Sequence, residues 1–383
     1  MKKKLKVGIL FGGKSGEHEV SVVSATNVAQ ALDPDKYDVT LIGIDKTGRW
    51  LLPDQSILLT NSKNPRLVKL NKEQKSVCLV PFEDERSLVP ADPSSSSAQA
   101  ARFDVILPIL HGTYGEDGTI QGLLELSNLP YVGSGVVGSS VGMDKDVSRR
   151  LLVQAGIHCV PTKVIRRHEF EKASDAIIQG LIKGLGLPFF VKPANMGSSV
   201  GVHKVKTSED ALTKLKDAFS YDVKVLAEKA VSARELEVAV LGNDQPKASV
   251  VGEIIPTHEF YSYEAKYMDE NGAHLKIPAE NLTAEQVKTI QQMALSAFQC
   301  LELKGLARVD FFLDKNSGQV YLNEVNTIPG FTQISMYPKL WMASGMTYAG
   351  LLDELIRLAL ERHAEKNSLK TSFDPNESDE SFT

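Results

Sequence analysis

The sequence predicts an α/β amino-terminal domain followed by two α+β units. The chain has 383 residues, too many for one ordinary domain and suited to two or three domains that share a cleft. Residues 5–11 (LKVGILF) are nearly all apolar and end in Gly12-Gly13, as expected for a buried strand of a parallel sheet and a tight turn. Predicted strands and helices then alternate up to about residue 137, which is typical of an α/β domain.

The other elements of this first domain, residues 1–137, follow from apolar spacing and turn residues. We expect helices at 19–32 and 119–127 and strands at 37–44 and 105–110. The stretch 50–103 is weakly patterned and contains a serine run, so it predicts surface hairpins and a flexible loop without chemistry.

The two later domains are expected at residues 138–231 and 232–366, before a polar, disordered tail at 367–383. The middle unit has predicted helices at 143–155, 169–183 and 208–219 and strands at 160–166, 188–193 and 223–228. The third has strands at 236–241 and 248–255, a helix at 283–301, a hairpin at 305–325 and a closing helix at 347–364.

The composition argues against several classes of protein. Lys and Arg number 43 against 48 Asp and Glu, a formal charge of −5, so no general attraction to nucleic acid is expected. The cysteines, Cys78, Cys159 and Cys300, lie far apart, which argues against a disulfide framework or a thiolate zinc site. No apolar stretch approaches the length of a membrane span, and no signal-peptide core follows the basic N-terminus. We therefore expect a cytoplasmic protein that binds neither nucleic acid nor membrane.

The most informative segment is 305–330 (GLARVDFFLDKNSGQVYLNEVNTIPG). Arg308 and Asp310 are two apart and share one face of a strand, as do Glu324 and Asn326. The DKNSG turn should fold the two strands into a hairpin that brings Asp310 close to Glu324. Two carboxylates and a carboxamide suit Mg²⁺ beside nucleotide phosphates, and Arg308 could stabilise a transferring phosphoryl group. The alternative is a solvated sheet face with a cross-strand ion pair.

Two glycine-rich loops could bind ligands. Residues 189–201 (FFVKPANMGSSVG) pass from an apolar strand through Lys192 into a loop whose backbone N–H groups could cradle phosphate. Residues 111–118 (HGTYGEDG) follow the predicted strand at 105–110, at the kind of strand end where α/β sheets bind ligands. Each loop has a structural alternative: an ordinary turn for the first, and for the second a turn whose Asp117 caps the next helix.

Residues 8–15 (GILFGGKS) match the P-loop pattern letter for letter, but their context rejects a P-loop. Gly8 lies inside the predicted strand, and apolar residues would have to form the phosphate loop. Glu17 and Glu19 also put negative charge where phosphates would bind. Because GxGxxG is absent, a dinucleotide-binding dehydrogenase has little support as well.

Taken in order, these segments resemble the D-alanine–D-alanine ligases of the ATP-grasp superfamily over about residues 6–360. The blocks HGTYGEDG and RVDFFLDKNSGQVYLNEVNTIPG are similar to signatures of that family. The resemblance implies a three-domain ATP-grasp architecture, with a Rossmann-like amino-terminal parallel sheet and two α+β domains that clasp ATP. It also implies a homodimer that makes D-alanyl-D-alanine for peptidoglycan through a D-alanyl phosphate.

The resemblance assigns residues to the first D-alanine. Glu17 would bind its ammonium group, and Ser198 and Tyr267 would join Glu17 in a network that closes the site. His111 would line the same pocket. Because Tyr267 follows Lys266, as in the dipeptide-forming members of the family, an amine is expected as the second substrate rather than D-lactate.

Further residues are assigned by the resemblance to the second D-alanine, to ATP and to metal. Around the second D-alanine are Gly330, Ser335 and Met336. Those expected on the ATP phosphates are Lys145, Lys192, Ser199 and Lys266, the last on a mobile loop at about 257–272. The adenine and ribose residues are Glu228, Lys229, Val231 and Glu235. The ligands of two Mg²⁺ ions, for which Mn²⁺ could substitute, are Asp310, Glu324 and Asn326, with Arg308 as the transition-state cation.

Several other functions stay open at this point. D-alanine–D-lactate or D-alanine–D-serine ligation, or another ATP-grasp carboxylate–amine ligation, would use the same ATP chemistry with a different substrate. A dehydrogenase built on residues 7–13 is a different class. A non-catalytic ATP-binding relative is another, although the intact set of lysines and acids argues against it.

Overall fold

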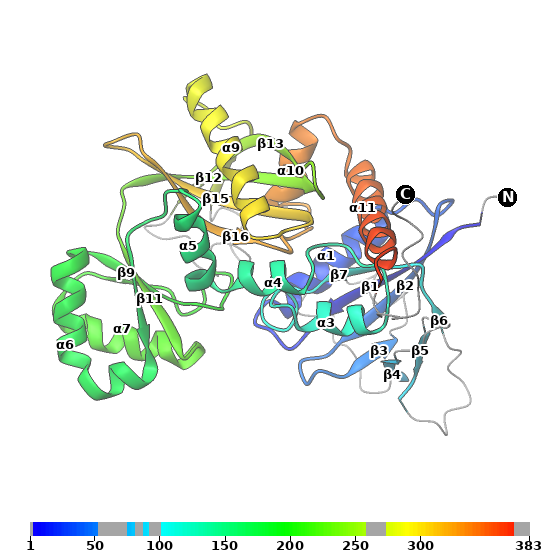
Figure 1. The fold of residues 1–383 in the computed structure, drawn as a ribbon, viewed down its shortest axis with the longest axis horizontal. Coiled ribbons are helices and arrows are strands. Elements are labelled where there is room, and N and C mark those ends of the chain that lie inside the picture. The colour runs from blue at the N-terminus through cyan, green and yellow to red at the C-terminus, as the bar shows by residue number, and fades with distance from the viewer. Residues whose placement is uncertain (1–2, 53–74, 81–86, 92–100, 258–272, 371–383) are drawn as a thin grey trace, which may run out of the picture.

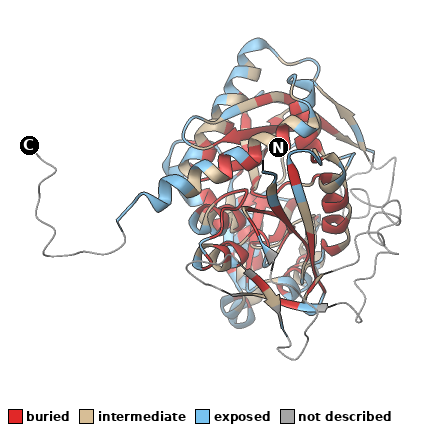
Figure 2. Ribbon diagram, turned by 90° about the vertical axis from the view of Figure 1, so that its right-hand side faces the viewer, coloured by how far each residue is buried: buried red, intermediate tan, exposed pale blue. Residues whose placement is uncertain are grey.

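The computed structural model describes residues 3–52, 75–80, 87–91, 101–257 and 273–370. Three sheets, of seven, four and five strands, organise this part of the chain (Figure 1). Buried residues concentrate on the strands and on the helix faces that cover them (Figure 2). None of the helices in the described ranges has the length and apolar character that a membrane span requires.

The amino-terminal sheet contains the predicted parallel strands. β1 (Leu5–Gly12) pairs in parallel with β2 (Tyr37–Ile44) on one side and β7 (Val105–Ile109) on the other. The sheet continues through the antiparallel strands β3 (Trp50–Leu52), β4 (Lys75–Val80), β5 (Ser87–Pro90) and β6 (Ala101–Arg102). The expected hairpins in 50–103 therefore widen the first sheet and make it mixed, because strands adjacent in sequence pair antiparallel. The serine run lies outside the described residues.

The apolar run of β1 is explained by burial on both faces of the sheet. Ile9 and Phe11 pack in a core with α1 (His18–Ala31) and α11 (Tyr348–Asn367). Leu10 packs in the core on the other face, with α3 (Thr119–Leu126). The last helix of the chain, α11, thus packs against the first sheet. Gly8 lies inside β1, as predicted in the argument against a P-loop.

The middle sheet is antiparallel, in the order β10-β9-β11-β8. Its strands are β8 (Thr162–Arg166), β9 (Phe189–Pro193), β10 (His203–Val205) and β11 (Lys224–Lys229). The helices α6 (Arg167–Leu185) and α7 (Ser208–Tyr221) cover one face, where they bury Val191 and Ala227. Since side chains alternate along a strand, Lys192 and Glu228 lie on the opposite face. Figure 1 shows α6 and α7 on the side of this sheet that faces away from β12 and β15.

The carboxy-terminal sheet has the order β14-β13-β12-β15-β16. Its strands are β12 (Ala233–Gly242), β13 (Lys247–Pro256), β14 (Ala273–Lys276), β15 (Gly305–Asp314) and β16 (Val320–Asn326). The helix α9 (Ala284–Cys300), which starts at a capping box of Thr283 and Gln286, buries Val309 and Phe311 on one face. Arg308 and Asp310 therefore lie on the other face.

Two helices connect the predicted units. α4 (Val136–Met143) crosses the boundary expected at residue 137, and α5 (Lys145–Gln154) follows it. α10 (Met336–Ala343), α4, β10 and β14 are elements that apolar spacing did not predict. The domain boundaries stay predictions, and α11 extends to Asn367, slightly into the expected tail.

Candidate active site

The β15–β16 hairpin brings the predicted metal ligands together. Asp310 lies opposite Glu324, and Arg308 lies opposite Asn326. The side-chain amide of Asn326 donates a hydrogen bond to Asp310 Oδ2 at 3.0 Å. The predicted proximity of Asp310 and Glu324 is confirmed, with a register shift just after Asp310 that the sequence did not indicate.

The donor chemistry of this face fits Mg²⁺. Asp310 and Glu324 offer carboxylate oxygens, and Asn326 offers its carboxamide oxygen because its nitrogen is directed to Asp310. No group of three or more His, Cys, Asp or Glu side chains placed to hold a metal occurs in the part of the chain that the structure describes. Two carboxylates and an amide are an incomplete shell, which nucleotide phosphates and water would complete.

Arg308 is held between two carboxylates. Its Nε and Nη2 donate to Oδ1 and Oδ2 of Asp310, each at 2.7 Å, and its Nε lies 3.1 Å from Glu237 Oε2. Burial opposes the charge on Arg308, but Asp310 and Glu237 raise its pKa well above the ordinary value. The guanidinium therefore stays charged beside the predicted metal ligands. Sequence reasoning missed Glu237, because the pairing of β12 with β15 is not visible in either strand alone.

A second cluster joins the polar face of the middle sheet to β16. Lys192 Nζ lies 2.8 Å from Glu228 Oε1 and donates to Asn323 Oδ1 at 3.2 Å. Arg149, on α5, forms an ion pair with Glu228 and donates to the Asn323 carbonyl at 3.1 Å. Burial alone would raise the pKa of Glu228, but Arg149 and Lys192 lower it, so the carboxylate stays ionised. For Lys192, burial lowers the pKa and Glu228 counters the effect.

Lys145 connects the two clusters. It is the first residue of α5, and its Nζ donates to the Met196 carbonyl at 2.8 Å. The same Nζ lies 3.5 Å from Glu324 Oε2. Three segments that are distant in sequence, α5, the glycine-rich loop and β16, therefore meet at one ammonium group, whose charge suits the predicted contact with ATP phosphates.

The remaining predicted nucleotide residues lie around these clusters. Lys229 is exposed at the end of β11, whereas Ser199, Val231 and Glu235 are half-buried. Ser198 and Ser199 have positive φ angles of 49° and 59°, a conformation that non-glycine residues rarely adopt and that concentrates at functional sites. Lys266 and Tyr267 lie outside the described residues. The adenine and ribose contacts stay predictions.

Glu17 and Ser198 meet, as the predicted network for the first D-alanine requires. The Ser198 hydroxyl donates to Glu17 Oε1. Ser15 Oγ accepts a hydrogen bond from the Glu17 backbone N–H at 2.9 Å and donates to the His111 carbonyl at 2.7 Å. A Cβ built at Gly112 or at Gly197 would lie 2.9 Å or 2.7 Å from Glu17 Oε2, so a side chain at either position would displace this carboxylate.

His111 is buried, and its hydrogen bonds fix its tautomer. Nδ1 lies 2.9 Å from the Ile328 carbonyl, which can only accept, so Nδ1 carries the proton. Nε2 then accepts from the Ser24 hydroxyl at 3.2 Å, and Ser24 Oγ accepts from the Phe331 backbone N–H at 3.2 Å. Burial lowers the pKa of His111, which favours this neutral form. The ring thus ties the 111–118 loop to the segment after β16.

Glu116 also connects the 111–118 loop to the segment after β16 by hydrogen bonds. Its Oε2 accepts from the Gly112 N–H at 2.7 Å, and its Oε1 accepts from the Ile328 N–H at 2.9 Å. Burial, and then the charge of Glu17, raises the pKa of Glu116 to about 8. Glu116 belongs to the HGTYGEDG block, but the sequence predicted no role for it. Its partner Ile328 is 212 positions away, so no local pattern indicates the contact.

The residues predicted around the second D-alanine, Gly330, Ser335 and Met336, come shortly after Ile328 in the chain. Ser335 Oγ accepts from the Thr332 N–H at 3.0 Å, and a Cβ at Gly330 would lie 2.8 Å from that oxygen. Met336 is buried in the core, where a Cβ at Gly252 would lie 2.7 Å from its terminal methyl group. The bulk of Met336 is therefore packed into the core, and its contact with the second D-alanine stays a prediction.

Fold and site together define the class of the protein. Two antiparallel sheets, each helix-covered on one face, carry lysines and acids on their other faces, and an α/β domain adds a buried glutamate to the same cluster. This arrangement is that of an ATP-grasp ligase.

Comparisons with known proteins agree with this class. Residues 6–134 match the D-ala D-ala ligase N-terminus family, and residues 151–357 match the D-ala D-ala ligase C-terminus family. The D-alanine–D-alanine ligase of Shouchella clausii is 51% identical over 97% of this chain and all of its own length. D-alanine–D-alanine ligase A of Escherichia coli K12 is 48% identical over 97% of this chain and all of its own length.

Solved structures give the same result. The D-alanine–D-alanine ligase of Coxiella burnetii superposes with a TM-score of 0.83 at 38% identity and covers 95% of this chain and 96% of its own. The VanG D-Ala:D-Ser ligase of Enterococcus faecalis superposes with a TM-score of 0.80 at 32% identity, over 93% of this chain and all of its own. The chain belongs to the D-alanine–D-alanine ligase family, and the resemblance predicted from the sequence is confirmed.

Proposed function

We propose that this protein uses ATP to join two D-alanine molecules into D-alanyl-D-alanine for peptidoglycan synthesis. One observation carries the proposal: the 195–201 loop contacts Glu17 through Ser198 and Lys145 through the Met196 carbonyl, and Lys145 Nζ lies 3.5 Å from Glu324. A carboxylate that suits an amino-acid ammonium group therefore lies at one end, and a residue that suits a nucleotide-bound metal lies at the other. The curated relatives named D-alanine–D-alanine ligase, at about half identity over nearly the whole chain, support the same reaction.

The residues on this line suit the first half of the reaction. A carboxylate is a poor electrophile, so the first D-alanine must be activated, and one of its carboxylate oxygens attacks the γ-phosphorus of ATP. Glu17 would hold its ammonium group while Lys145 and Lys192 offset charge on the phosphates. Asp310, Glu324 and Asn326 would hold Mg²⁺, which neutralises phosphate charge when bound. ADP leaves and a D-alanyl phosphate remains.

The second half forms the peptide bond. The amine of the second D-alanine attacks the acyl carbon, and the tetrahedral intermediate expels phosphate. Arg308 would act before this attack, by stabilising the charge that develops on the phosphoryl group transferred in the first half. His111 and Glu116 hold the backbone of Ile328, just before Gly330, so they would fix the second amino-acid pocket relative to the first. Water would hydrolyse the intermediate, so a closing lid is needed. The 195–201 loop, and the segment with Lys266 and Tyr267 that lies outside the described residues, stay the two predicted candidates for it.

A coupled assay for ADP release tests the reaction and its second substrate. We expect ADP release with D-alanine alone, D-alanyl-D-alanine as the product, and little added turnover when D-lactate is supplied. Faster turnover with D-serine than with D-alanine would instead assign D-alanine–D-serine ligation, the activity in the name of the structural relative VanG. ATP hydrolysis without a dipeptide or depsipeptide product would reject all three reactions.

We also propose that the enzyme acts in the cytoplasm as a homodimer. Its proposed nucleotide substrate, ATP, supports the location, and the family resemblance supports the dimer. Light scattering should give twice the mass of the chain at micromolar concentration; the mass of a single chain would contradict the dimer.

A further inference from the structure

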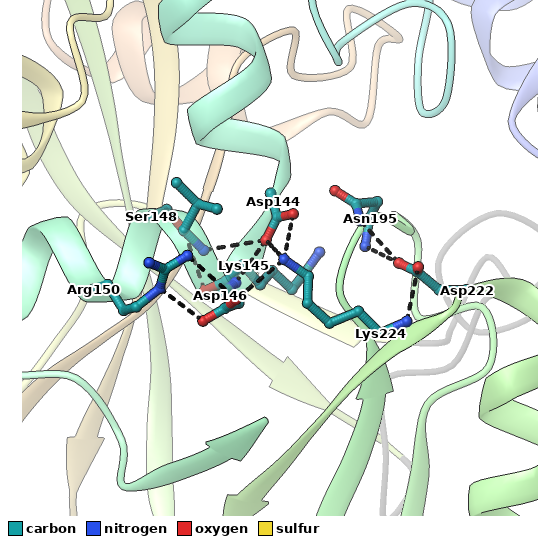
Figure 3. Close-up of polar contacts among 9 residues, drawn as sticks. Asp144, Lys145, Asp146, Ser148, Arg150, Asn195, Asp222 and Lys224 are labelled. Carbon is teal, nitrogen blue, oxygen red and sulfur yellow. Dashed lines mark hydrogen bonds and ion pairs between the residues drawn. The ribbon is translucent and has the colours of Figure 1, made fainter. Parts of the chain in front are cut away.

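A buried ion-pair cluster lies beside the proposed phosphate site and has no role in the reaction described above (Figure 3). Lys224, the first residue of β11, directs its Nζ to both oxygens of Asp144, at 2.7 and 2.6 Å, and to Asp146 Oδ2 at 3.1 Å. The three side chains are at most 18% exposed. One cation is thus surrounded by carboxylates from a segment about 80 positions earlier in the chain.

The two aspartates flank Lys145, the residue on which the phosphate site depends. Asp144 caps α5, and its Oδ1 accepts hydrogen bonds from the backbone N–H groups of Asp146 and Val147, each at 3.1 Å. The Asp144 carboxylate is therefore shared between the start of α5 and Lys224. The position of the Lys145 Cα is fixed on both sides by residues that Lys224 holds.

The backbone around Lys224 extends the same connection to the glycine-rich loop. The Lys145 N–H donates to the Ala194 carbonyl at 3.1 Å, and the Ala194 N–H donates to the Lys224 carbonyl at 3.0 Å. Asp222 Oδ2 accepts from the backbone and side-chain N–H groups of Asn195, each at 2.9 Å, and Figure 3 shows this pair beside Lys224. The start of the loop and the start of α5 are thus attached to the same end of β11.

The charges of Asp144 and Asp146 explain why their ion pairs with Lys224 affect the position of Lys145. Burial alone would raise the pKa of Asp146, but Lys224 and Arg150 lower it, so the acid stays ionised. Without Lys224, Asp146 would still pair with Arg150, whose Nε lies 3.1 Å from its Oδ1, but Asp144 would lose this ion pair, and the two carboxylates on either side of Lys145 would have one cation fewer to offset them. Their repulsion, together with the loss of the tie to β11, would displace the first turn of α5 and the ammonium group that it carries.

We propose that Lys224 is a positioning residue for ATP: by holding Asp144 and Asp146, it sets the place of Lys145 and of the 195–201 loop, and thereby the affinity for the nucleotide phosphates. The proposal rests on the assignment of Lys145 to those phosphates. It predicts an effect on nucleotide binding that a purely structural ion pair would not have.

The test measures the affinity for adenylyl imidodiphosphate with Mg²⁺ by calorimetry on the full chain. For Lys224→Met we expect the Kd to rise by roughly tenfold or more, since small displacements of a positioned charge have large effects. Lys224→Arg, which keeps the charge, should recover binding to within about threefold of the wild type. Lys216→Met, at an exposed lysine of α7 in the same unit, is the matched control and should leave the Kd unchanged.

Kinetics separate positioning from general destabilisation. The KM for ATP should rise in Lys224→Met by a larger factor than the KM for the first D-alanine, because Lys145 is attached directly to the cluster, whereas Glu17 is reached only through Ser198 on the 195–201 loop. A lowered melting temperature and a reduced kcat, with Kd and KM for ATP unchanged, would overturn the proposal. If Lys224→Met does not fold, Asp146→Asn decides: a Kd raised by roughly threefold supports the proposal and an unchanged Kd overturns it.

A Lys145→Met variant distinguishes this inference from the proposed function. If Lys145→Met weakens nucleotide binding and Lys224→Met does not, the role of Lys224 fails and the phosphate assignment stands. If Lys145→Met leaves binding unchanged, both fail. Nucleotide binding without ADP release from D-alanine would contradict the proposed substrate and leave the test of Lys224 intact.

Discussion

At the scale of single residues, several side chains of the site each bind two partners. Asp310 accepts hydrogen bonds from Arg308 and from Asn326, and Glu116 accepts from two backbone N–H groups on separate segments. Buried polar atoms need such partners, since an unsatisfied one costs about 1–3 kcal/mol. The same partners hold these charged groups in place.

Glu324→Gln should lower turnover by more than about tenfold. The substitution keeps the shape of the side chain but removes its charge, and with it the proposed Mg²⁺ ligand and the ion-pair partner of Lys145 at 3.5 Å. ADP release at saturating ATP and D-alanine measures the effect. Glu171→Gln, at an exposed position of α6, is the control and should keep normal turnover. Near-normal activity in Glu324→Gln would contradict the metal assignment.

Glu116 should make stability depend on pH. Because its pKa is raised to about 8 in the folded protein, the folded state binds this proton more tightly than the unfolded state does. Stability from this group is present at low pH and is lost as the pH rises from about 4.5 toward 8. Glu116→Gln should therefore show a smaller decrease in the free energy of unfolding between pH 5 and pH 8.

Urea unfolding at several pH values checks this prediction, with Glu171→Gln as the control that keeps the wild-type slope. At pH 5 the Gln variant should be less stable by about 1–3 kcal/mol, because its amide cannot accept both backbone hydrogen bonds. Parallel pH profiles of Glu116→Gln and the wild type would contradict the raised pKa.

At the scale of elements, alternation along strands decides which residues reach the site. On β15, Val309 and Phe311 pack against α9 and leave Arg308 and Asp310 for the polar face; on β9, Val191 packs against α6 and α7 and leaves Lys192. Helix packing on one face of each sheet therefore determines which face can carry the chemistry.

The segment between β13 and β14, which carries Tyr267, should control the choice of the second substrate. We expect Tyr267→Phe to raise ester formation with D-lactate relative to dipeptide formation, because the phenol hydroxyl belongs to the proposed network with Glu17 and Ser198. Product analysis with D-alanine and D-lactate together measures the ratio. Tyr263→Phe, in the same segment, should leave it unchanged, and an unchanged ratio in Tyr267→Phe would reject this role.

At the scale of the whole molecule, the site exists because segments from all three sheets converge. The residues of the proposed phosphate and metal site come from α5, β9, β15 and β16, and Glu17 and His111 come from loops of the first sheet. A ligand that contacts several of these segments should therefore stabilise the folded chain as a unit.

Adenylyl imidodiphosphate with Mg²⁺, at about 100 times its Kd, should stabilise the protein by about 2.7 kcal/mol and raise its melting temperature. Glu324→Gln should show a smaller increase at the same concentration, and removal of Mg²⁺ with a chelator should reduce the increase in the wild type. Calorimetric melting curves make the measurement. No increase at saturating nucleotide would contradict a nucleotide site in the folded protein.

Local patterns in the sequence determined most of the elements and many candidate residues. The apolar run of β1, the turn between β15 and β16, and the helices α1, α7, α9 and α11 were predicted from spacing and turn chemistry, which act over a few residues. The face of the hairpin that carries Arg308, Asp310, Glu324 and Asn326 follows from the period of two along a strand. Roles in binding came from the resemblance to a family, not from spacing.

Tertiary structure alone decided which of these patterns act together. Glu116 meets Ile328, Arg149 meets Glu228, Glu237 meets Arg308, and Lys224 meets Asp144 across 71 to 212 positions, and no local signal marks any of these pairs. Short elements such as β10 and β14 were missed because three or four residues carry too little periodicity. Local propensity fixes elements over a few residues, whereas long-range pairs form only when the packing of the sheets and helices brings distant charges together.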